Sequence, residues 1–197
     1  MQITMKDDFI LTLYQKPQTV FSLKELSFLA PKLPYDNLKS RMSYYVKSGK
    51  ILKIRRGIFA KKNYNILEIP NKIYTPSYIS LETVLQRAGI IFQNYSSIFA
   101  VSYLTRTILV AKNKLIYRSM KKDILLNKNG ITEENGYFIA SAERAFLDGV
   151  FLYKNYHFDN LKRIDWDKIW PLVTIYANDS FEKRIKDYYQ TYKEEYG

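Results

Sequence analysis

Apolar residues recur at helical spacing between residues 35 and 48. They stand at positions i, i+4, i+7 and i+8 and comprise Leu38, Met42, Tyr45 and Val46. This period predicts an amphipathic helix whose apolar face lies toward a core. Gly49 is expected to end the helix, because glycine adopts the left-handed conformation at low cost.

A shorter helix is predicted just before it. Ser22 and Glu25 have the three-residue spacing of a capping box, and Phe21 and Leu26 flank them where a hydrophobic staple forms. The helix then covers about residues 23–29. Two prolines between residues 30 and 34 mark the turn that joins the two helices, since proline ends one helix and is tolerated in the first turn of the next.

Two short strands are predicted after Gly49. Four apolar residues surround the basic run Lys53–Gly57, and Arg55, Arg56 and Gly57 are expected at the tip of the hairpin. A further helix is predicted over Asp7–Tyr14, where it would close the small core. Helix, turn, helix and hairpin in this order indicate a winged helix-turn-helix domain, which binds duplex DNA.

The exposed face of the longer helix and the hairpin supply the candidate DNA contacts. These residues are Asn37, Lys39, Ser40, Arg41, Ser43, Tyr44, Lys47, Lys53, Arg55 and Arg56. Short polar side chains on the ridge of a helix reach base edges, while longer cations beside them contact phosphates. The alternative is an ordinary helical subdomain whose charges are merely solvated.

The positive charge of the chain is concentrated in this first part. The net charge is +12; residues 1–65 hold 13 Lys and Arg against 4 Asp and Glu, whereas the remaining 132 residues hold 18 against 15. The first third is therefore expected to bind a polyanion. No apolar run approaches a membrane span and the start of the chain lacks a signal-peptide pattern, so a cytoplasmic protein without a membrane partner is expected.

A second domain is predicted over residues 73–197, after a first domain over residues 1–65 and a linker over residues 66–72. A helix is expected to start at Thr75 and Pro76 and to end at Gly89, and a second one to run from Ser141 to about residue 153. Strands are expected over residues 96–103, 105–111, 115–118 and 136–139. These elements predict an α+β unit with a small, mostly antiparallel sheet.

Two helices are expected at the end of the chain. The first covers Asp165–Tyr176, and the second starts at Ser180 with an aromatic stripe that includes Tyr188, Tyr189 and Tyr192. Packing of this stripe within its own domain is the first interpretation. A dimer or partner surface is the alternative, because aromatic residues favour interfaces.

Signals of catalysis are sparse. The chain has no cysteine and one histidine, His157, expected in a loop, and no phosphate loop, metal-ligand spacing or cofactor motif is present. The candidate polar constellation for catalysis is Glu143, Arg144 and Asp148 on the helix that starts at Ser141. Arg144 and Asp148 are spaced to pair with each other. An enzyme that uses this constellation, or the segment Ser77–Glu82, stays an alternative.

Two strings in the second domain resemble the AbiEi family, the antitoxins of bacterial type IV, abortive-infection toxin–antitoxin systems. The strings are Pro76-Ser77-Tyr78-Ile79-Ser80-Leu81-Glu82-x-x-Leu85-x-x-x-Gly89 and, after Tyr117-Arg118, Ala140-Ser141-Ala142-Glu143-Arg144-Ala145-Phe146-Leu147-Asp148. The resemblance includes Arg56-Gly57-x-Phe59 of the hairpin and covers about residues 5–155. Val84 and Arg144 stand where the family usually has alanine and lysine.

The resemblance implies a protein with two functions. Its winged helix would repress its own operon. Inverted repeats in the operator DNA, bound by a homodimer where two protomers bind together, are expected from the exposed face of the longer helix and the positive charge of residues 1–65. Its second domain would counter a toxin of nucleotidyltransferase-like fold, as in phage defence. The motif residues of that domain are Ser77, Tyr78, Ser80, Glu82, Glu143, Arg144 and Asp148. The alternatives are a phosphotransferase-like enzyme or nuclease accessory, and a transcriptional regulator that has no toxin partner.

Overall fold

The chain folds as two compact units, one ending at Ile73 and the other beginning at Tyr74. The structure is a computed structural model that describes residues 5–110, 112–153 and 155–196. Both units combine helices with a β-sheet, which confirms the predicted α+β class. Within the described ranges, none of the helices is both long and apolar enough to span a membrane.

The first unit contains helices and a three-stranded antiparallel sheet in the order β1-β3-β2. Its first elements are α1 (Met5–Gln15), β1 (Val20–Ser22), α2 (Leu23–Leu29), α3 (Tyr35–Lys47), β2 (Leu52–Arg55) and β3 (Ile58–Ala60). The predicted helices and hairpin are confirmed. The strand β1 was not anticipated, although Val20 and Phe21 are residues that favour strands.

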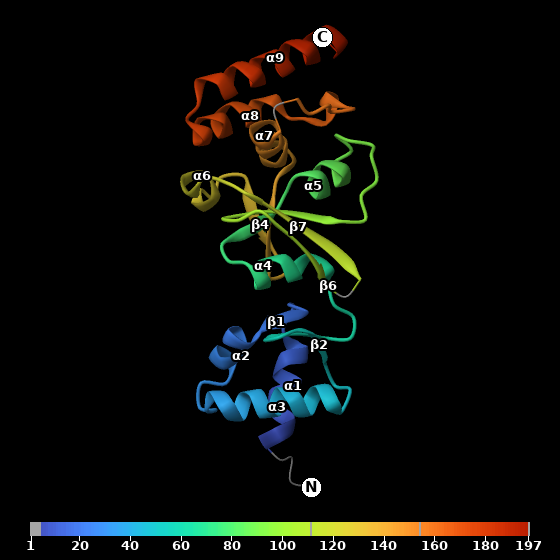
Figure 1. Cartoon of the computed structure of the whole chain (residues 1–197), viewed down its shortest axis with the longest axis vertical. Helices are drawn as coiled ribbons and strands as arrows, with labels where there is room; N and C mark the ends of the chain where they lie inside the picture. The colour runs from blue at the N-terminus through green and yellow to red at the C-terminus, as the bar shows by residue number, and fades with distance from the viewer. Residues whose placement is uncertain (1–4, 111, 154, 197) are drawn as a thin grey trace. The chain divides into compact units, whose positions relative to one another are not determined.

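The core of the first unit lies where α1 crosses α3 (Figure 1). The predicted apolar stripe of α3 is confirmed, since Leu38, Met42 and Tyr45 are buried and Val46 packs against them. The capping box of α2 is confirmed as well. The Ser22 hydroxyl accepts the N–H of Glu25 at 3.2 Å, and the Glu25 carboxylate accepts the N–H of Ser22 at 2.8 Å.

Residues 66–72, expected as a linker, instead form part of the first unit. Ile66–Glu68 is a 3₁₀ turn, and α4 (Ile69–Ile73) follows it directly. Glu68, Ile69 and Asn71 are buried. The composition of this segment resembles that of a loop, but the Glu68 carboxylate binds the backbone at the start of β1 and thereby fixes the segment.

The second unit is built on a six-stranded sheet in the order β6-β7-β5-β4-β9-β8. Its strands are β4 (Ser77–Ile79), β5 (Ile98–Ser102), β6 (Arg106–Val110), β7 (Asn113–Ser119), β8 (Ile131–Glu134) and β9 (Tyr137–Ala140). The expected small, mostly antiparallel sheet is thus a larger, mixed one. β5 runs parallel to β7 and β4 runs parallel to β9, so both central strands are bordered on one side by a parallel neighbour.

Two details differ from the sequence prediction. The helix expected from Thr75 is wrong at its start: the Thr75–Pro76 peptide is cis, the strand β4 follows, and α5 (Glu82–Arg87) begins six residues after Pro76, the first helical residue expected. The strand β8 and helix α6 (Lys122–Leu126) were missed. The strand expected over residues 105–111 is β6, and its last predicted residue lies outside the described residues.

Helices stack in layers on one face of this sheet (Figure 1). They are α7 (Ala142–Leu152), α8 (Trp166–Val173) and α9 (Asp179–Tyr196). The tyrosine stripe of α9 packs within its own unit: the rings of Tyr189 and Tyr192 lie 4.9 and 5.5 Å from the ring of Trp166. Tyr188 donates its hydroxyl to the carbonyl of Tyr156 at 2.6 Å.

Candidate nucleic-acid interface and a buried polar network

Helix α3 presents a polar face that the unit does not cover. Because the apolar stripe of α3 is buried, its opposite side is exposed, and Asn37, Ser40, Ser43, Tyr44 and Lys47 all lie there. Tyr44 is the largest of them and is 57% exposed. This face therefore combines short polar groups with one aromatic ring and one cation, which are groups that can meet base edges and phosphates.

The two other cations of α3 are held by neighbours. The guanidinium of Arg41, which is half-buried, lies 6.0 Å from the ring of Phe9 on α1. The ammonium of Lys39 is 3.1 Å from the carboxylate of Asp36 and 4.4 Å from the ring centroid of Tyr35. An exposed ion pair of this kind contributes little stability, so Lys39 can leave Asp36 for a phosphate at small cost.

The hairpin of β2 and β3 presents the remaining predicted contacts. Lys53, Arg55 and Arg56 are all exposed, with Arg55 at the end of β2 and Arg56 in the turn. The turn is anchored, because the carbonyl of Gly57 accepts the N–H of Leu23, the first residue of α2, at 2.8 Å. The backbone that carries the two arginines is thus fixed relative to α2.

Gly57 permits this turn. Its φ is +75°, a conformation that costs glycine little, and open space surrounds the position of a Cβ atom. The structure therefore places all ten predicted DNA-contact residues at the surface of α3 or the hairpin, with Arg41 half-buried and the other nine exposed.

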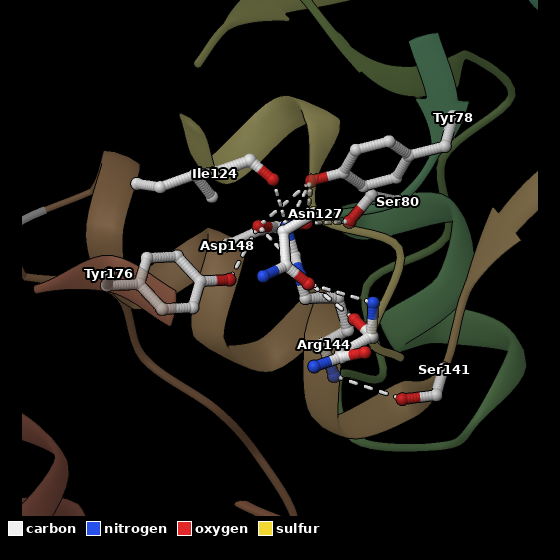
Figure 2. Close-up of polar contacts among 9 residues, drawn as sticks. Tyr78, Ser80, Ile124, Asn127, Ser141, Arg144, Asp148 and Tyr176 are labelled. Carbon is white, nitrogen blue, oxygen red and sulfur yellow. Dashed lines mark hydrogen bonds and ion pairs between the residues drawn. The ribbon is translucent and has the colours of Figure 1, made fainter. Parts of the chain in front are cut away.

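The second unit holds a buried polar network centred on Arg144 and Asp148 (Figure 2). Both side chains are fully buried, one turn apart on α7, and the Nε of Arg144 lies 3.3 Å from the carboxylate of Asp148. This pairing was predicted from the spacing and is confirmed. A buried charge pair is tolerated only when its remaining hydrogen-bonding groups are also satisfied.

Three hydroxyl groups satisfy Asp148. Ser80 donates to its carboxylate at 2.8 Å, Tyr78 at 3.1 Å and Tyr176 at 2.7 Å. Figure 2 shows the three hydroxyls converging on the carboxylate from β4, from the residue after β4 and from the 3₁₀ turn after α8. Burial, and then the adjacent charge of Asp148, raise the pKa of both tyrosines well above the usual value, so both phenols stay protonated donors.

The guanidinium of Arg144 binds the backbone of α6 and of the loop that follows it. It donates to the carbonyl of Ile124 at 2.7 Å and to that of Asn129 at 2.9 Å. Gly130 comes next in this loop, and a Cβ there would lie 2.9 Å from the Cβ of Arg144. Arg144 thus ties α7 to a loop that only glycine allows to approach so closely.

The motif residues of the second unit separate into two groups. The network unites Tyr78, Ser80, Arg144 and Asp148. Ser77 lies outside it and donates to the carbonyl of Tyr74 at 2.6 Å. Sequence reasoning missed Tyr176, since no local pattern links a residue 28 positions after Asp148 to that carboxylate.

Two buried glutamates also stand apart from the network. Glu143 is buried at the start of α7. Burial raises the pKa of the Glu82 carboxyl, which lies near Tyr153 and Arg118. Leu81 separates Glu82 from Ser80 and has a φ of +56°, which is rare for a leucine and turns the chain between the two.

The geometry of the network indicates a structural role. Its charged groups are inaccessible to solvent, and its carboxylate is saturated with donors, so the network positions β4, α7 and the loop after α6. In the part of the chain that the structure describes, no group of three His, Cys, Asp or Glu side chains is arranged to hold a metal ion. Comparison of the chain with known protein-family models and with curated proteins found no match.

Proposed function

We propose that the first unit is a winged helix-turn-helix that binds operator DNA through α3 and the β2–β3 hairpin. The observation that carries this proposal is the exposed polar face of α3 beside an anchored basic turn. The order of elements, α1-β1-α2-α3-β2-β3 with the sheet order β1-β3-β2, agrees with it. The concentration of positive charge in residues 1–65 supplies the attraction to phosphate.

Within this interface, α3 reads sequence and the hairpin provides affinity. Ser40, Ser43 and Tyr44 stand on the ridge of α3, where side chains reach base edges in the major groove. Arg55 and Arg56 leave the hairpin from a fixed backbone and contact phosphates or the minor groove.

Footprinting on the DNA upstream of the gene tests the DNA-binding proposal. Two protomers that bind together should protect inverted half-sites a whole number of helical turns apart. The specific part of the proposal is overturned if the full chain binds this DNA no better than random duplex at about 150 mM salt.

We further propose that the chain is the antitoxin of a toxin–antitoxin pair, with the second unit countering a nucleotidyltransferase-like toxin. The support is the resemblance of residues 76–89 and 140–148 to AbiEi antitoxins. Those two strings contribute four side chains of the buried network, so in this proposal they maintain the unit, and other surfaces meet the partner.

The antitoxin proposal predicts a nucleotidyltransferase-like gene beside this one, and it is tested in cells that express that gene. A form of the full chain carrying Arg55→Ala and Arg56→Ala should still protect these cells, because protection is assigned to the second unit. If protection disappears together with DNA binding, the chain acts as a stand-alone regulator. If protection needs Glu143 or Glu82 while folding does not, the enzyme alternative is favoured.

A further inference from the structure

The two edges of the six-stranded sheet differ in how they are protected from pairing with another strand. The edge strand β8 carries Glu133 and Glu134, and charged side chains are a common device that prevents strand addition. The other edge strand, β6, has the sequence Arg-Thr-Ile-Leu-Val. Its only charge stands at its first residue, and Leu109 near its end is 77% exposed.

Strand β6 can accept a further strand along its whole length. It pairs with β7 over all five of its residues, from Arg106 opposite Tyr117 to Val110 opposite Asn113, so it is extended and regular. Among the strands that the structure describes, it has a neighbour on one side only. Since successive residues of a strand direct their N–H and C=O groups to alternate sides, every second residue of β6 offers a donor and an acceptor at the open edge.

The segment that contains this edge strand is positively charged. The second unit, from residue 74 onward, holds 17 Lys and Arg against 14 Asp and Glu. Six of these 17 cationic residues fall within residues 104–122, which contain no Asp or Glu. The rest of the unit therefore holds 11 Lys and Arg against 14 Asp and Glu. Arg106, Lys112 and Lys114 of this segment are exposed, and Lys114 lies directly opposite Leu109 on β7.

We propose that the β6 edge is an interaction surface that takes an extended, acidic segment of a partner protein as an additional strand. The backbone of β6 would supply the hydrogen bonds, Leu109 would contact an apolar side chain, and Arg106 and Lys114 would pair with carboxylates. This surface is separate from α3 and the hairpin, and the inference does not depend on DNA binding by the first unit.

Two other occupants fit the edge less well. A second copy of the chain could pair with β6 in antiparallel fashion, centred on Ile108. Arg106 of one copy would then lie opposite Val110 of the other, near the turn that carries Lys112, so the positive charges of Arg106 and Lys112 would meet. Nucleic acid would satisfy the cations, but it would leave the exposed Leu109 side chain and the open backbone groups of β6 without a matching surface.

A labelled peptide that alternates Glu and Val tests the proposal by fluorescence polarisation with the full chain. The peptide should bind. A version with Lys in place of Glu should bind at least about tenfold more weakly, because its charge is reversed. A version N-methylated at alternate amides should be weakened to the same extent, because methylation removes the hydrogen bonds between strands. If the methylated peptide binds as well as the parent, strand addition is refuted.

Three variants locate the site. Leu109→Lys and Arg106→Glu should each weaken binding of the Glu–Val peptide about tenfold. Leu126→Lys, which changes another exposed leucine of the same unit, should leave binding of the peptide unchanged. All three positions are at the surface, so the melting temperature should stay the same.

Other results overturn the proposal in favour of a different occupant. A dimer in sedimentation experiments that Leu109→Lys dissociates would assign the edge to a second copy. Weaker duplex-DNA binding by Arg106→Glu, with peptide binding unchanged, would assign the segment to nucleic acid.

Discussion

The carboxylate of Glu68 clamps the backbone of Thr19. It accepts the Thr19 N–H at 2.8 Å and the neighbouring N–H of Val20 at 2.8 Å, and it also receives the Thr19 hydroxyl. Val20 is the first residue of β1, the strand that pairs with β3 of the hairpin, and Thr19 precedes it. The segment after the hairpin is therefore needed to complete the sheet of the first unit.

A fragment of residues 1–73 is expected to fold, whereas a fragment of residues 1–65 is not. The shorter fragment loses Glu68 and leaves the N–H groups of Thr19 and Val20 without their acceptor, which costs about 1–3 kcal/mol for each buried group left unsatisfied. Thermal unfolding followed by circular dichroism compares the two. Cooperative unfolding of residues 1–65 alone would show that the clamp is dispensable.

Replacing Arg55 and Arg56 with Ala should weaken DNA binding to all sequences alike. Both side chains are exposed, so the loss should be electrostatic, and the slope of log affinity against log salt should fall by about two units. The matched control replaces Lys162 and Lys183, which are exposed in the second unit, and should leave the slope unchanged. A changed base preference with an unchanged slope would mean that the roles are assigned wrongly.

Arg144 and Asp148 should be strongly coupled in stability. Arg144→Met leaves a buried carboxylate without its cation and should destabilise the second unit by about 3–5 kcal/mol. The double variant Arg144→Met with Asp148→Leu should lose much less than the sum of the two single variants. Urea unfolding of the full chain measures all three, and additive losses would contradict the coupling.

Gly130→Ala should destabilise the second unit more than Gly89→Ala does. The two glycines have similar φ values, +74° and +70°, so both substitutions incur the same backbone strain. At Gly130 the new Cβ would also lie 2.9 Å from the Cβ of Arg144, whereas at Gly89 the nearest atom lies 3.9 Å away. Overpacking of this kind adds about 1–3 kcal/mol, measured by urea unfolding. Equal losses would show that the loop moves away freely.

The first unit should lose stability in mild acid through Glu25. Burial opposes ionisation of this carboxyl, but the Lys72 ammonium and the N–H of Ser22 outweigh burial and lower its pKa. Because the pKa of Glu25 is lower in the folded state, its ionised form stabilises the folded unit above the unfolded-state pKa of about 4.3. This stabilisation is lost as the pH falls through the folded-state pKa. The protection factors of the α2 amides, which correct the exchange rates for the intrinsic effect of pH, should therefore fall below about pH 4.5 in the natural chain. Glu25→Gln should not show this fall, and an identical acid response in both chains would contradict the assignment.

Local signals determined much of the first unit. The capping box at Ser22, the stripe from Leu38 to Val46 and Gly49 each act within a few residues, so periodicity and capping predicted α2 and α3 correctly. The missed strand β8 also had a local signal: the Asn135-Gly136 pair between β8 and β9, both residues at positive φ, is typical of a tight hairpin turn.

The sequence by itself also determined the spacing that pairs Arg144 with Asp148, because one turn of a helix brings such residues together. Only the tertiary structure decided what surrounds that pair. Tyr78, Ser80 and Tyr176 lie 70, 68 and 28 residues away from Asp148 in the sequence, and such distances carry no periodic signal. The same holds for Glu68. The composition of its segment predicts a linker, but its carboxylate accepts the N–H of Thr19, 49 positions earlier in the sequence, and this fixes the segment. Long-range hydrogen bonds to a buried charge depend on how the strands and helices pack, and packing is a property of the whole fold.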